Sequence, residues 1–306
     1  MNGRFGAWMR LPVRQPFRLD LTVDALRRLA ANAVDVAGSD GTYCRAMRDK
    51  HGAALVGVRA GGSGSIEVRA TGRDTERWLP SVRRLLGTDA DLREWYARSA
   101  TIPWLRELSH VLTGLKPPRY PTLWEACAHA VVFAQISIHA GAAIMRRLVE
   151  ALAEEVVGGG VRGRIFPEPE RWLGAGEAVL RGAGLSANKS AYLRSAATAF
   201  ADGSMSEDRL EALPTEDAAA ALCAIRGIGP WSAAVALLRG MGRLDVFPLR
   251  DSGVARSLVH AGGESLDDVL ETLGPVRGML YFHLLLARLH PPAAQPARRS
   301  VRSKNA

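Results

Sequence analysis

Residues 222–258, LCAIRGIGPWSAAVALLRGMGRLDVFPLRDSGVARSL, decide the expected fold. A helical pattern ends near Ile225, and Pro230 stands where the first turn of a following helix tolerates proline. Gly227 and Gly229 lie between these two points and permit a tight turn. The stretch therefore predicts a helix–hairpin–helix.

This hairpin can present main-chain N–H groups to a phosphate. Gly227 and Gly229 flank Ile228 and allow a close approach of the backbone, while the next helix N-terminus adds a partial positive charge. Such a turn would hold a DNA backbone without reading its sequence. A bare GIG is equally consistent with a turn that only joins two packed helices.

One acid, Asp251, stands where the next helix is expected to begin, shortly after Pro248. A carboxylate at a helix N-cap stabilises the helix by ~1 kcal/mol and needs no other reason to be there. The position alone therefore leaves two interpretations of Asp251 open, a cap and a catalytic acid.

The composition favours a polyanionic partner. The chain has 306 residues with 40 basic and 31 acidic side chains, a net charge of +9 and a pI near 10.1. A codon bias toward arginine would give a similar charge, so nucleic acid is one of two explanations. The absence of an 18-residue apolar run and of a secretory signal predicts a soluble, cytoplasmic protein, in a bacterium at the nucleoid.

Cysteine and histidine usage predicts no disulfide framework and no transition-metal site. The three cysteines, Cys44, Cys127 and Cys223, lie far apart and are expected at core or neutral positions. Cys127 and His129 alternate instead of sharing a helix face, so they do not form a ligand pair. We expect no required cofactor.

The pattern divides the chain into an α+β part and a helical part. Short alternating stretches at 17–23, 42–48, 54–60 and 65–70 predict strands, and helical patterns at 23–34 and 74–87 lie among them. We therefore expect a small N-terminal α+β module with an antiparallel sheet over 1–86. An all-helical core is expected over 87–290, and a disordered basic tail over 291–306.

Several motifs occur in the order shown by one known family. They are the hairpin IRGIGPWSA, the following DVFPLRD, the upstream AQIS, the segment LRGAGLSANKSAYLRSAATAFADG and the final GPVRGMLYFHLLL. In this order the chain resembles the HhH-GPD superfamily of DNA glycosylases, and within it the DNA-3-methyladenine glycosylase II branch. The likeness is weaker before residue 86 and clearest over residues 87–286.

The resemblance implies a mechanism. The damaged nucleotide would be flipped out of duplex DNA into a cleft between two helical lobes. The Asp251 carboxylate would stabilise positive charge on the deoxyribose as the N-glycosidic bond breaks, and would orient or deprotonate the attacking water. Alkylated purines such as 3-methyladenine and 7-methylguanine are already cationic, so they leave without a protein acid.

Trp231 occupies the position where strand-nicking members of the family carry a lysine. Without that amine no Schiff base forms there, so the resemblance implies a monofunctional enzyme that leaves an abasic site. The Trp231 ring would stack on a cationic base by cation–π attraction; packing in a core is its alternative role.

Other residues take implied roles from the same alignment of motifs. Ile136 would enter the gap left by the flipped base, with packing in a core as its alternative role. Gln135 would contact the orphaned base or nearby backbone. Main-chain carbonyls of Cys223, Ile225 and Ile228 would hold a structural K⁺ or Na⁺ that bridges to a phosphate.

The sequence also departs from the family pattern. Val235 and Leu285 stand where alkylpurine enzymes often carry further aromatic residues, and Arg250 stands beside the acid, where it could lower the pKa of Asp251 or contact a phosphate. Three alternatives stay open: a glycosylase for an oxidised or deaminated base, a glycosylase that also nicks the strand, and a non-catalytic DNA-binding protein. The resemblance implies a monomer acting on double-stranded DNA.

Overall fold

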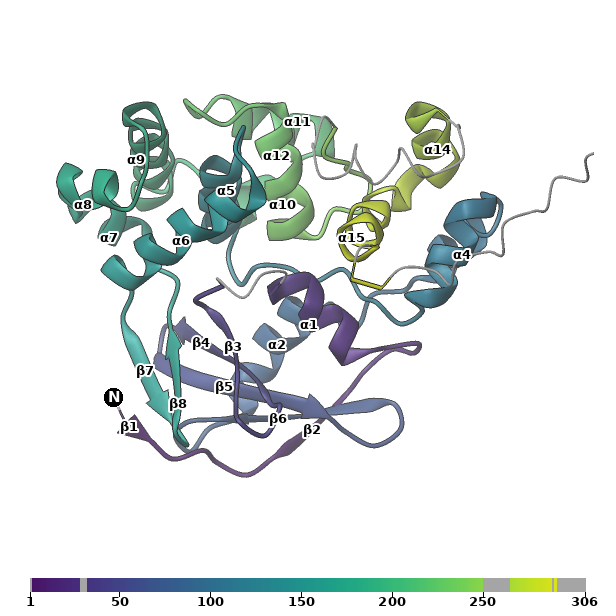
Figure 1. Ribbon diagram of the computed structural model, residues 1–306, viewed down its shortest axis with the longest axis horizontal. Helices are drawn as coiled ribbons and strands as arrows, with labels where there is room; N and C mark the ends of the chain where they lie inside the picture. Colours follow the sequence, from purple (N-terminus) through teal and green to yellow (C-terminus); the bar gives the residue numbers. More distant parts are fainter. Residues whose placement is uncertain (1, 28–31, 250–264, 288, 291–306) are drawn as a thin grey trace, which may run out of the picture.

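The computed structural model of the chain describes residues 2–27, 32–249, 265–287 and 289–290. A sheet module forms the lower part of the molecule in Figure 1, and helices form the upper part. The expected combination of an N-terminal antiparallel sheet with a helical core is confirmed. The predicted basic tail at 291–306 lies outside the described residues.

The main sheet has five antiparallel strands in the order β2-β6-β5-β4-β3. Their bounds are β2 Met9–Pro12, β3 Asp35–Ala37, β4 Tyr43–Asp49, β5 Gly52–Ala60 and β6 Ser65–Ala70. The strands expected at 42–48, 54–60 and 65–70 are confirmed. A 3₁₀ turn, Glu76–Trp78, and α2, Leu79–Leu86, follow, and their Trp78, Val82 and Leu85 pack into the same core as the strands.

The strand expected at 17–23 is wrong, because this segment forms helix α1, Leu19–Arg27. Its buried residues Leu21, Thr22, Ala25 and Leu26 follow the spacing of one helix face. The apolar residues of this short stretch fit both the period of a helix and the period of a strand. Packing against α2 and α15 decides in favour of the helix.

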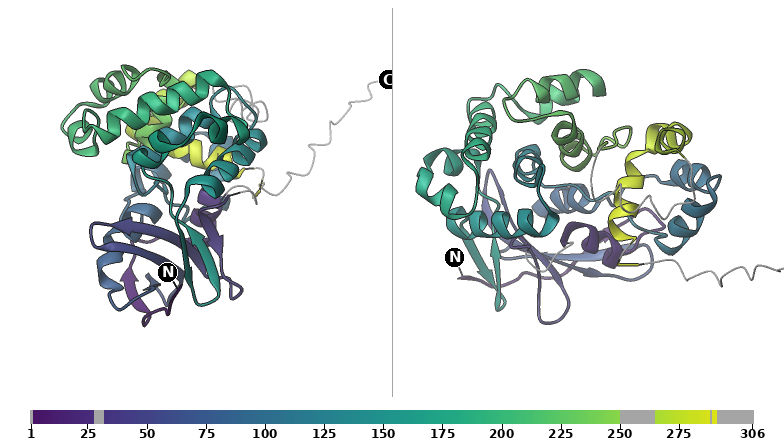
Figure 2. Two further views of the ribbon diagram at one scale, coloured as in Figure 1. Left: turned by 90° about the vertical axis from the view of Figure 1, so that its left-hand side faces the viewer. Right: turned by 45° about the horizontal axis from the view of Figure 1, so that its top comes forward.

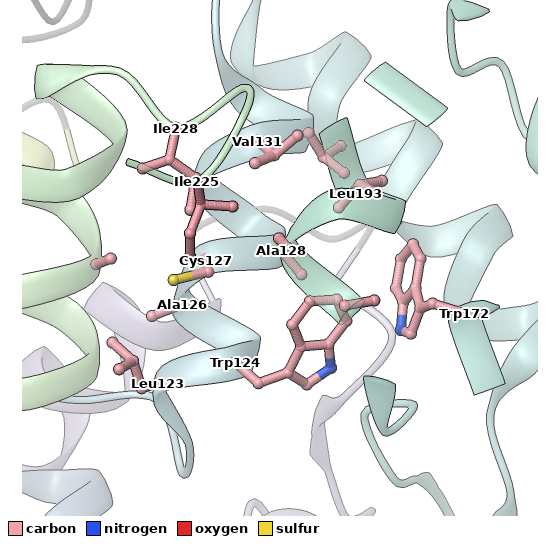
Figure 3. Packing of buried hydrophobic residues seen from close by; sticks show 14 of the residues in the cluster. Leu123, Trp124, Ala126, Cys127, Ala128, Val131, Trp172, Leu193, Ile225 and Ile228 are labelled. Carbon is pink, nitrogen blue, oxygen red and sulfur yellow. The ribbon is translucent and has the colours of Figure 1, made fainter. Parts of the chain in front are cut away.

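The helices of the upper part gather around two cores. The first surrounds α5, Leu123–Phe133, whose residues are buried on nearly every side (Figure 3). The helices of this group are α6 Ile138–Leu152, α7 Pro169–Gly174, α8 Glu177–Gly182, α9 Ala187–Ala201, α10 Glu207–Glu211, α11 Thr215–Cys223 and α12 Pro230–Ala236, which runs on into a π-helical turn, Leu237–Met241.

The second core lies among helices from both ends of the chain, at the right of Figure 1. It contains residues of α1, α3 Arg93–Ser99, α4 Pro103–Val111, α14 Leu266–Leu273, the 3₁₀ turn Gly274–Val276 and α15 Gly278–Leu286. Leu238 and Phe247 extend from the α12 region into this core, so the two helical groups are joined through buried side chains.

One part of the helical region departs from the all-helical expectation. Strands β7, Glu155–Gly158, and β8, Val161–Arg164, form an antiparallel hairpin between α6 and α7, and β7 pairs in parallel with β1, Asn2–Gly3. Val156 and Ile165 pack with Cys44, Ala46 and Leu55 of the main sheet. The second view in Figure 2 shows this hairpin descending from the helices to the sheet. Its GGG turn and flanking valines are a strand signal that helical periodicity on either side obscures.

A buried ionic group connects the sheet to α5. Arg45 donates to Asp35 at 2.6 Å and to Glu125 at 2.5 Å, and the three side chains are 1–2% exposed. The Tyr43 hydroxyl also donates to Asp35 at 2.6 Å. Burial raises the pKa of Glu125, whereas for Asp35 the effect of burial is outweighed by Arg45 and Tyr43, and the pKa of this carboxyl is lowered.

Within the described residues, none of the helices combines the length and apolar character needed to cross a membrane. Cys44 and Cys127 are buried core residues, as expected, while Cys223 is exposed at the end of α11.

Candidate functional site

The predicted helix–hairpin–helix is confirmed. Helix α11 ends at Cys223, and α12 begins at Pro230 with Gly229 as its N-cap. In the turn, the Ile225 amide donates to Leu222 O at 3.1 Å and the Ile228 amide donates to Ile225 O at 3.0 Å. These bonds make the turn compact, because each amide finds an acceptor within a few residues.

The two glycines of the hairpin have different surroundings. Gly227 has φ of +93°, and a Cβ added there would lie 2.2 Å from Cγ of Tyr192. Gly229 has φ of −93°, and a Cβ added there would meet nothing within 4 Å. The protein's own packing therefore explains Gly227 but not Gly229, which leaves room for an external group at the α12 N-terminus.

The hydrophobic side chains of the hairpin point inward. Ile225 and Ile228 are 9% and 4% exposed and belong to the core around α5. In Figure 3 they lie toward the end of α5 that carries Val131, away from Leu123. Ile228 can thus contribute to a phosphate site only through its main chain.

The turn between α5 and α6 lies at this same end of α5. Gln135 is exposed and has φ of +58°, the one positive value at a non-glycine residue among the described parts of the chain. Ile136 is half-buried. Ser137 is the N-cap of α6, and its side chain accepts a hydrogen bond from the Ala140 amide. The structure thus brings Gln135 and Ile136 to the same end of α5 as the hairpin.

Trp231 lies in the first turn of α12 and is half-buried. Val235 follows one turn later on the same helix and is 5% exposed, and Leu285 on α15 is half-buried. The predicted catalytic residue Asp251 and its neighbour Arg250 lie outside the described residues. The chain can be followed to Leu249, whose side chain is 51% exposed.

The carbonyls predicted to hold a cation come from both ends of the hairpin turn. Ile225 O already accepts the Ile228 amide, and a carbonyl oxygen has a second lone pair. This carbonyl could therefore still be a ligand from its other side, together with those of Cys223 and Ile228.

Sequence reasoning missed two residues that support these turns, Lys189 and Tyr192 of α9. The Lys189 ammonium donates to Val132 O and Ala134 O at the end of α5, and Tyr192 packs against Gly227. A lysine and a tyrosine in the first half of an amphipathic helix give no signal in the sequence, because their partners are main-chain atoms of distant segments.

Comparison with known proteins agrees with this architecture. Residues 8–122 match the AlkA N-terminal domain, and residues 128–270 match the family described as HhH-GPD superfamily base excision DNA repair protein. The first match ends directly before α5 and includes α3 and α4 as well as the sheet module. The second match begins inside α5 and covers the helices around the hairpin.

Two bacterial proteins share sequence with the chain. A DNA-3-methyladenine glycosylase of Bacillus subtilis is 28% identical over 191 residues, 61% of this chain and 63% of the relative. A Mycobacterium tuberculosis protein, named a probable bifunctional transcriptional activator/DNA repair enzyme AlkA, is 29% identical over 251 residues, 80% of this chain and 49% of the relative. The chain therefore spans less than two thirds of the length of these two relatives.

Solved structures share the fold. A 3-methyladenine DNA-glycosylase from Archaeoglobus fulgidus has a TM-score of 0.77 at 24% identity, over 91% of this chain and 97% of that one. An 8-oxoguanine glycosylase/lyase from Clostridium acetobutylicum, bound to DNA, has a TM-score of 0.73 at 16% identity, over 93% and 98%. At these identities the likeness shows the fold alone.

The sheet module, the two helical groups and the glycine hairpin together define a base excision repair fold. The chain belongs to the HhH-GPD superfamily, in its AlkA-like branch.

Proposed function

We propose that the chain is a monofunctional DNA glycosylase that flips an alkylated purine out of duplex DNA and hydrolyses its N-glycosidic bond. The observation that carries the DNA part of this proposal is Gly229. Its Cβ position is open and its φ is ordinary, so the glycine leaves space for a phosphate at the α12 N-terminus, where main-chain N–H groups and the helix dipole attract an anion.

The alkylated-base part is supported by the names of relatives and by Trp231. The Bacillus subtilis and Archaeoglobus fulgidus proteins are both named as 3-methyladenine glycosylases. Trp231 offers an aromatic face that attracts a cationic base, and a tryptophan cannot form the Schiff base needed for strand nicking.

In the proposed reaction, Asp251 acts as an anion. Its carboxylate stabilises the oxocarbenium character that develops on the deoxyribose and accepts a proton from the attacking water. The purine leaves with the bonding electrons and becomes neutral, because alkylation had already made it cationic. The product is an abasic site on an intact strand.

The proposed partner is a double-stranded DNA carrying one damaged base, bound by a single copy of the chain. The reaction needs no cofactor. The carbonyls of Cys223, Ile225 and Ile228 would hold a K⁺ or Na⁺ ion, and its contribution would be structural, by placing positive charge where the hairpin meets a phosphate.

The test is release of free bases from methylated duplex DNA by the wild-type protein and by Asp251→Asn. We expect 3-methyladenine or 7-methylguanine from the wild type and at least ~100-fold slower release from the variant. The strand should break only after alkali treatment. A covalent protein–DNA adduct after borohydride treatment would show a lyase instead, and release of only oxidised or deaminated bases would move the proposal to another lesion.

A further inference from the structure

Lys189 makes an unusual contact for a lysine on a surface helix. It lies in the first turn of α9, where the side chain of the N-cap residue, Ser186, accepts a hydrogen bond from the Lys189 amide. Its ammonium leaves α9 and donates to Val132 O at 2.5 Å and to Ala134 O at 2.8 Å. Burial of the ammonium lowers the pKa of Lys189. The Lys189 ammonium is thus partly removed from water, and its two hydrogen bonds to main-chain carbonyls compensate for this.

Both acceptors belong to the end of α5. The last carbonyls of a helix lack hydrogen-bond partners within the helix, and a lysine ammonium can supply them. The same carbonyls carry the negative partial charge of the helix, which also attracts a cation. Since Lys189 belongs to α9, these bonds also fix the end of α5 relative to a second helix. The Ala134 carbonyl is part of the peptide group that leads directly into Gln135.

The residue after Ala134, Gln135, has a strained backbone conformation. Gln135 has φ of +58°, a region that residues with a Cβ rarely adopt and that occurs often at functional turns. Gln135 is also exposed, so its own side chain is not held by a core. The two hydrogen bonds from Lys189 hold the start of this turn from a second helix, α9.

The same face of α9 also supports the hairpin. Tyr192 follows Lys189 by three residues, a spacing that places both side chains on one side of the helix. Its Cβ and ring occupy the space in which a Cβ at Gly227 would lie, 2.3 and 2.2 Å away. One turn of α9 therefore contacts both the α5–α6 turn and the glycine hairpin.

We propose that Lys189 is a positioning residue that holds Gln135 and Ile136 in place for insertion into the base stack while the hairpin holds the backbone of the same DNA. This inference rests on the proposed DNA function. It assigns Lys189 no contact with the reacting atoms. Loss of the lysine would let the peptide group after Ala134 rotate and Gln135 return to an ordinary φ, which moves Ile136 away from the gap.

The first measurement needs no chemistry on the base. A duplex carries a tetrahydrofuran abasic analogue beside 2-aminopurine, whose fluorescence rises when a wedge unstacks it. We expect Lys189→Met to lose most of this rise and Lys189→Arg, which keeps the charge and two donors, to retain it. An unchanged signal in Lys189→Met overturns the proposal.

The second measurement separates positioning from general damage. Single-turnover release of 7-methylguanine is compared between a fully paired duplex and one in which the base faces an abasic analogue, where less pairing opposes flipping. For Lys189→Met we expect release to fall about 10- to 100-fold on the paired duplex and clearly less on the other. An equal fall on both substrates overturns the proposal.

Two further variants keep the test decisive. Lys116→Met is the matched control, because Lys116 is also buried and donates to a main-chain carbonyl, Ala90 O at 2.7 Å, that is not part of the α5–α6 turn. This variant should keep the fluorescence rise. If Lys189→Met does not fold, Lys189→Gln takes its place.

Glycine adopts a left-handed φ without strain, so the effect of removing Lys189 should be smaller in a Gln135→Gly background. An equal effect of removing Lys189 in both backgrounds contradicts the mechanism.

Failure of the proposed function would be recognised separately. If the wild type releases no methylated base but raises the 2-aminopurine signal, the lesion assignment is wrong and the fluorescence series alone decides the role of Lys189. If the wild type raises no signal with abasic-analogue DNA, the wedge role of the α5–α6 turn is wrong and the inference falls with it.

Discussion

The two glycines of the hairpin allow stability and DNA binding to be separated by a pair of single-methyl changes. In Gly227→Ala the new Cβ would lie 2.2 Å from Cγ and 2.3 Å from Cβ of Tyr192. Rotation of the tyrosine ring cannot relieve the second contact, because Cβ is attached to the backbone of α9. The backbone at φ +93° must also be held against the preference of alanine.

The expected destabilisation follows from these two effects. A left-handed conformation costs a residue with a Cβ ~1–2 kcal/mol, and overpacking in a core costs ~1–3 kcal/mol. Gly227→Ala should therefore lower the free energy of unfolding by about 2–5 kcal/mol. At roughly 2 °C for each kcal/mol in a protein of this size, Tm should fall by about 4–10 °C.

Gly229→Ala should show the opposite pattern. Its Cβ meets no atom within 4 Å and its φ of −93° suits alanine. The weaker N-cap and the reduced freedom of the unfolded chain nearly cancel, so the free energy of unfolding should stay within ~0.5 kcal/mol of the wild type. If a phosphate fills the open space, loss of its bonds to the main chain should weaken DNA binding by roughly 10- to 100-fold.

The assays are thermal unfolding and fluorescence anisotropy with a duplex that carries an abasic analogue. Gly176→Ala is the matched control, since Gly176 is also an N-cap glycine, at the start of α8, with open space around its Cβ position. Wild-type affinity in Gly229→Ala would refute a close approach of DNA to the hairpin. Wild-type stability in Gly227→Ala would refute the packing against Tyr192.

Three further changes test other parts of the structure. Arg45→Met leaves Asp35 and Glu125 buried without their cation, so it should lower the free energy of unfolding by ~3–5 kcal/mol. Without the cation, the pKa values of both carboxyls lie above those in the unfolded chain. Thermal unfolding should therefore show a loss of stability that grows as pH rises from about 4 to 8. Burial lowers the pKa of Lys116 to about 8, below its unfolded value. The unfolded chain therefore binds more protons above pH 8, so stability relative to Lys116→Met should rise between about pH 8 and 10 in denaturant titrations. Trp231→Ala should slow release of cationic 7-methylguanine about 2- to 30-fold, the loss of ~0.5–2 kcal/mol of cation–π attraction, and should slow release of neutral hypoxanthine less; equal slowing of both would point to a packing role.

Much of the fold could be predicted because its signals are local. The alternating pattern predicts β4, β5 and β6 at their observed places. At the start of α5 the signal is equally local, since the N-cap residue Thr122 accepts a hydrogen bond from the Glu125 amide. The segment 17–23 was misassigned because its seven residues fit either period. The β7–β8 hairpin was missed because it is short and lies between long helices.

The candidate site was predictable only where a residue type itself carries the information. Glycines at the hairpin and Pro230 at the helix start have conformational meaning that the sequence displays. The left-handed φ of Gln135 and the bonds from Lys189 depend on tertiary contacts between segments about 55 residues apart in the chain, for which the sequence contains no pattern. Asp251 is singled out by the order of the motifs around it, because its position alone fits a helix N-cap equally well.

The β7–β8 hairpin has a consequence for anyone who wishes to express the helical half by itself. A Cβ at Gly163 would lie 2.5 Å from Leu55 and one at Gly158 would lie 2.2 Å from Thr71, so the hairpin fits tightly against the N-terminal module. Truncation at residue 86 would remove these partners together with β1 and leave Val156 and the edge of β7 bare, a surface prone to strand-to-strand aggregation. A self-standing helical fragment would therefore need residues 154–165 replaced by a short polar loop.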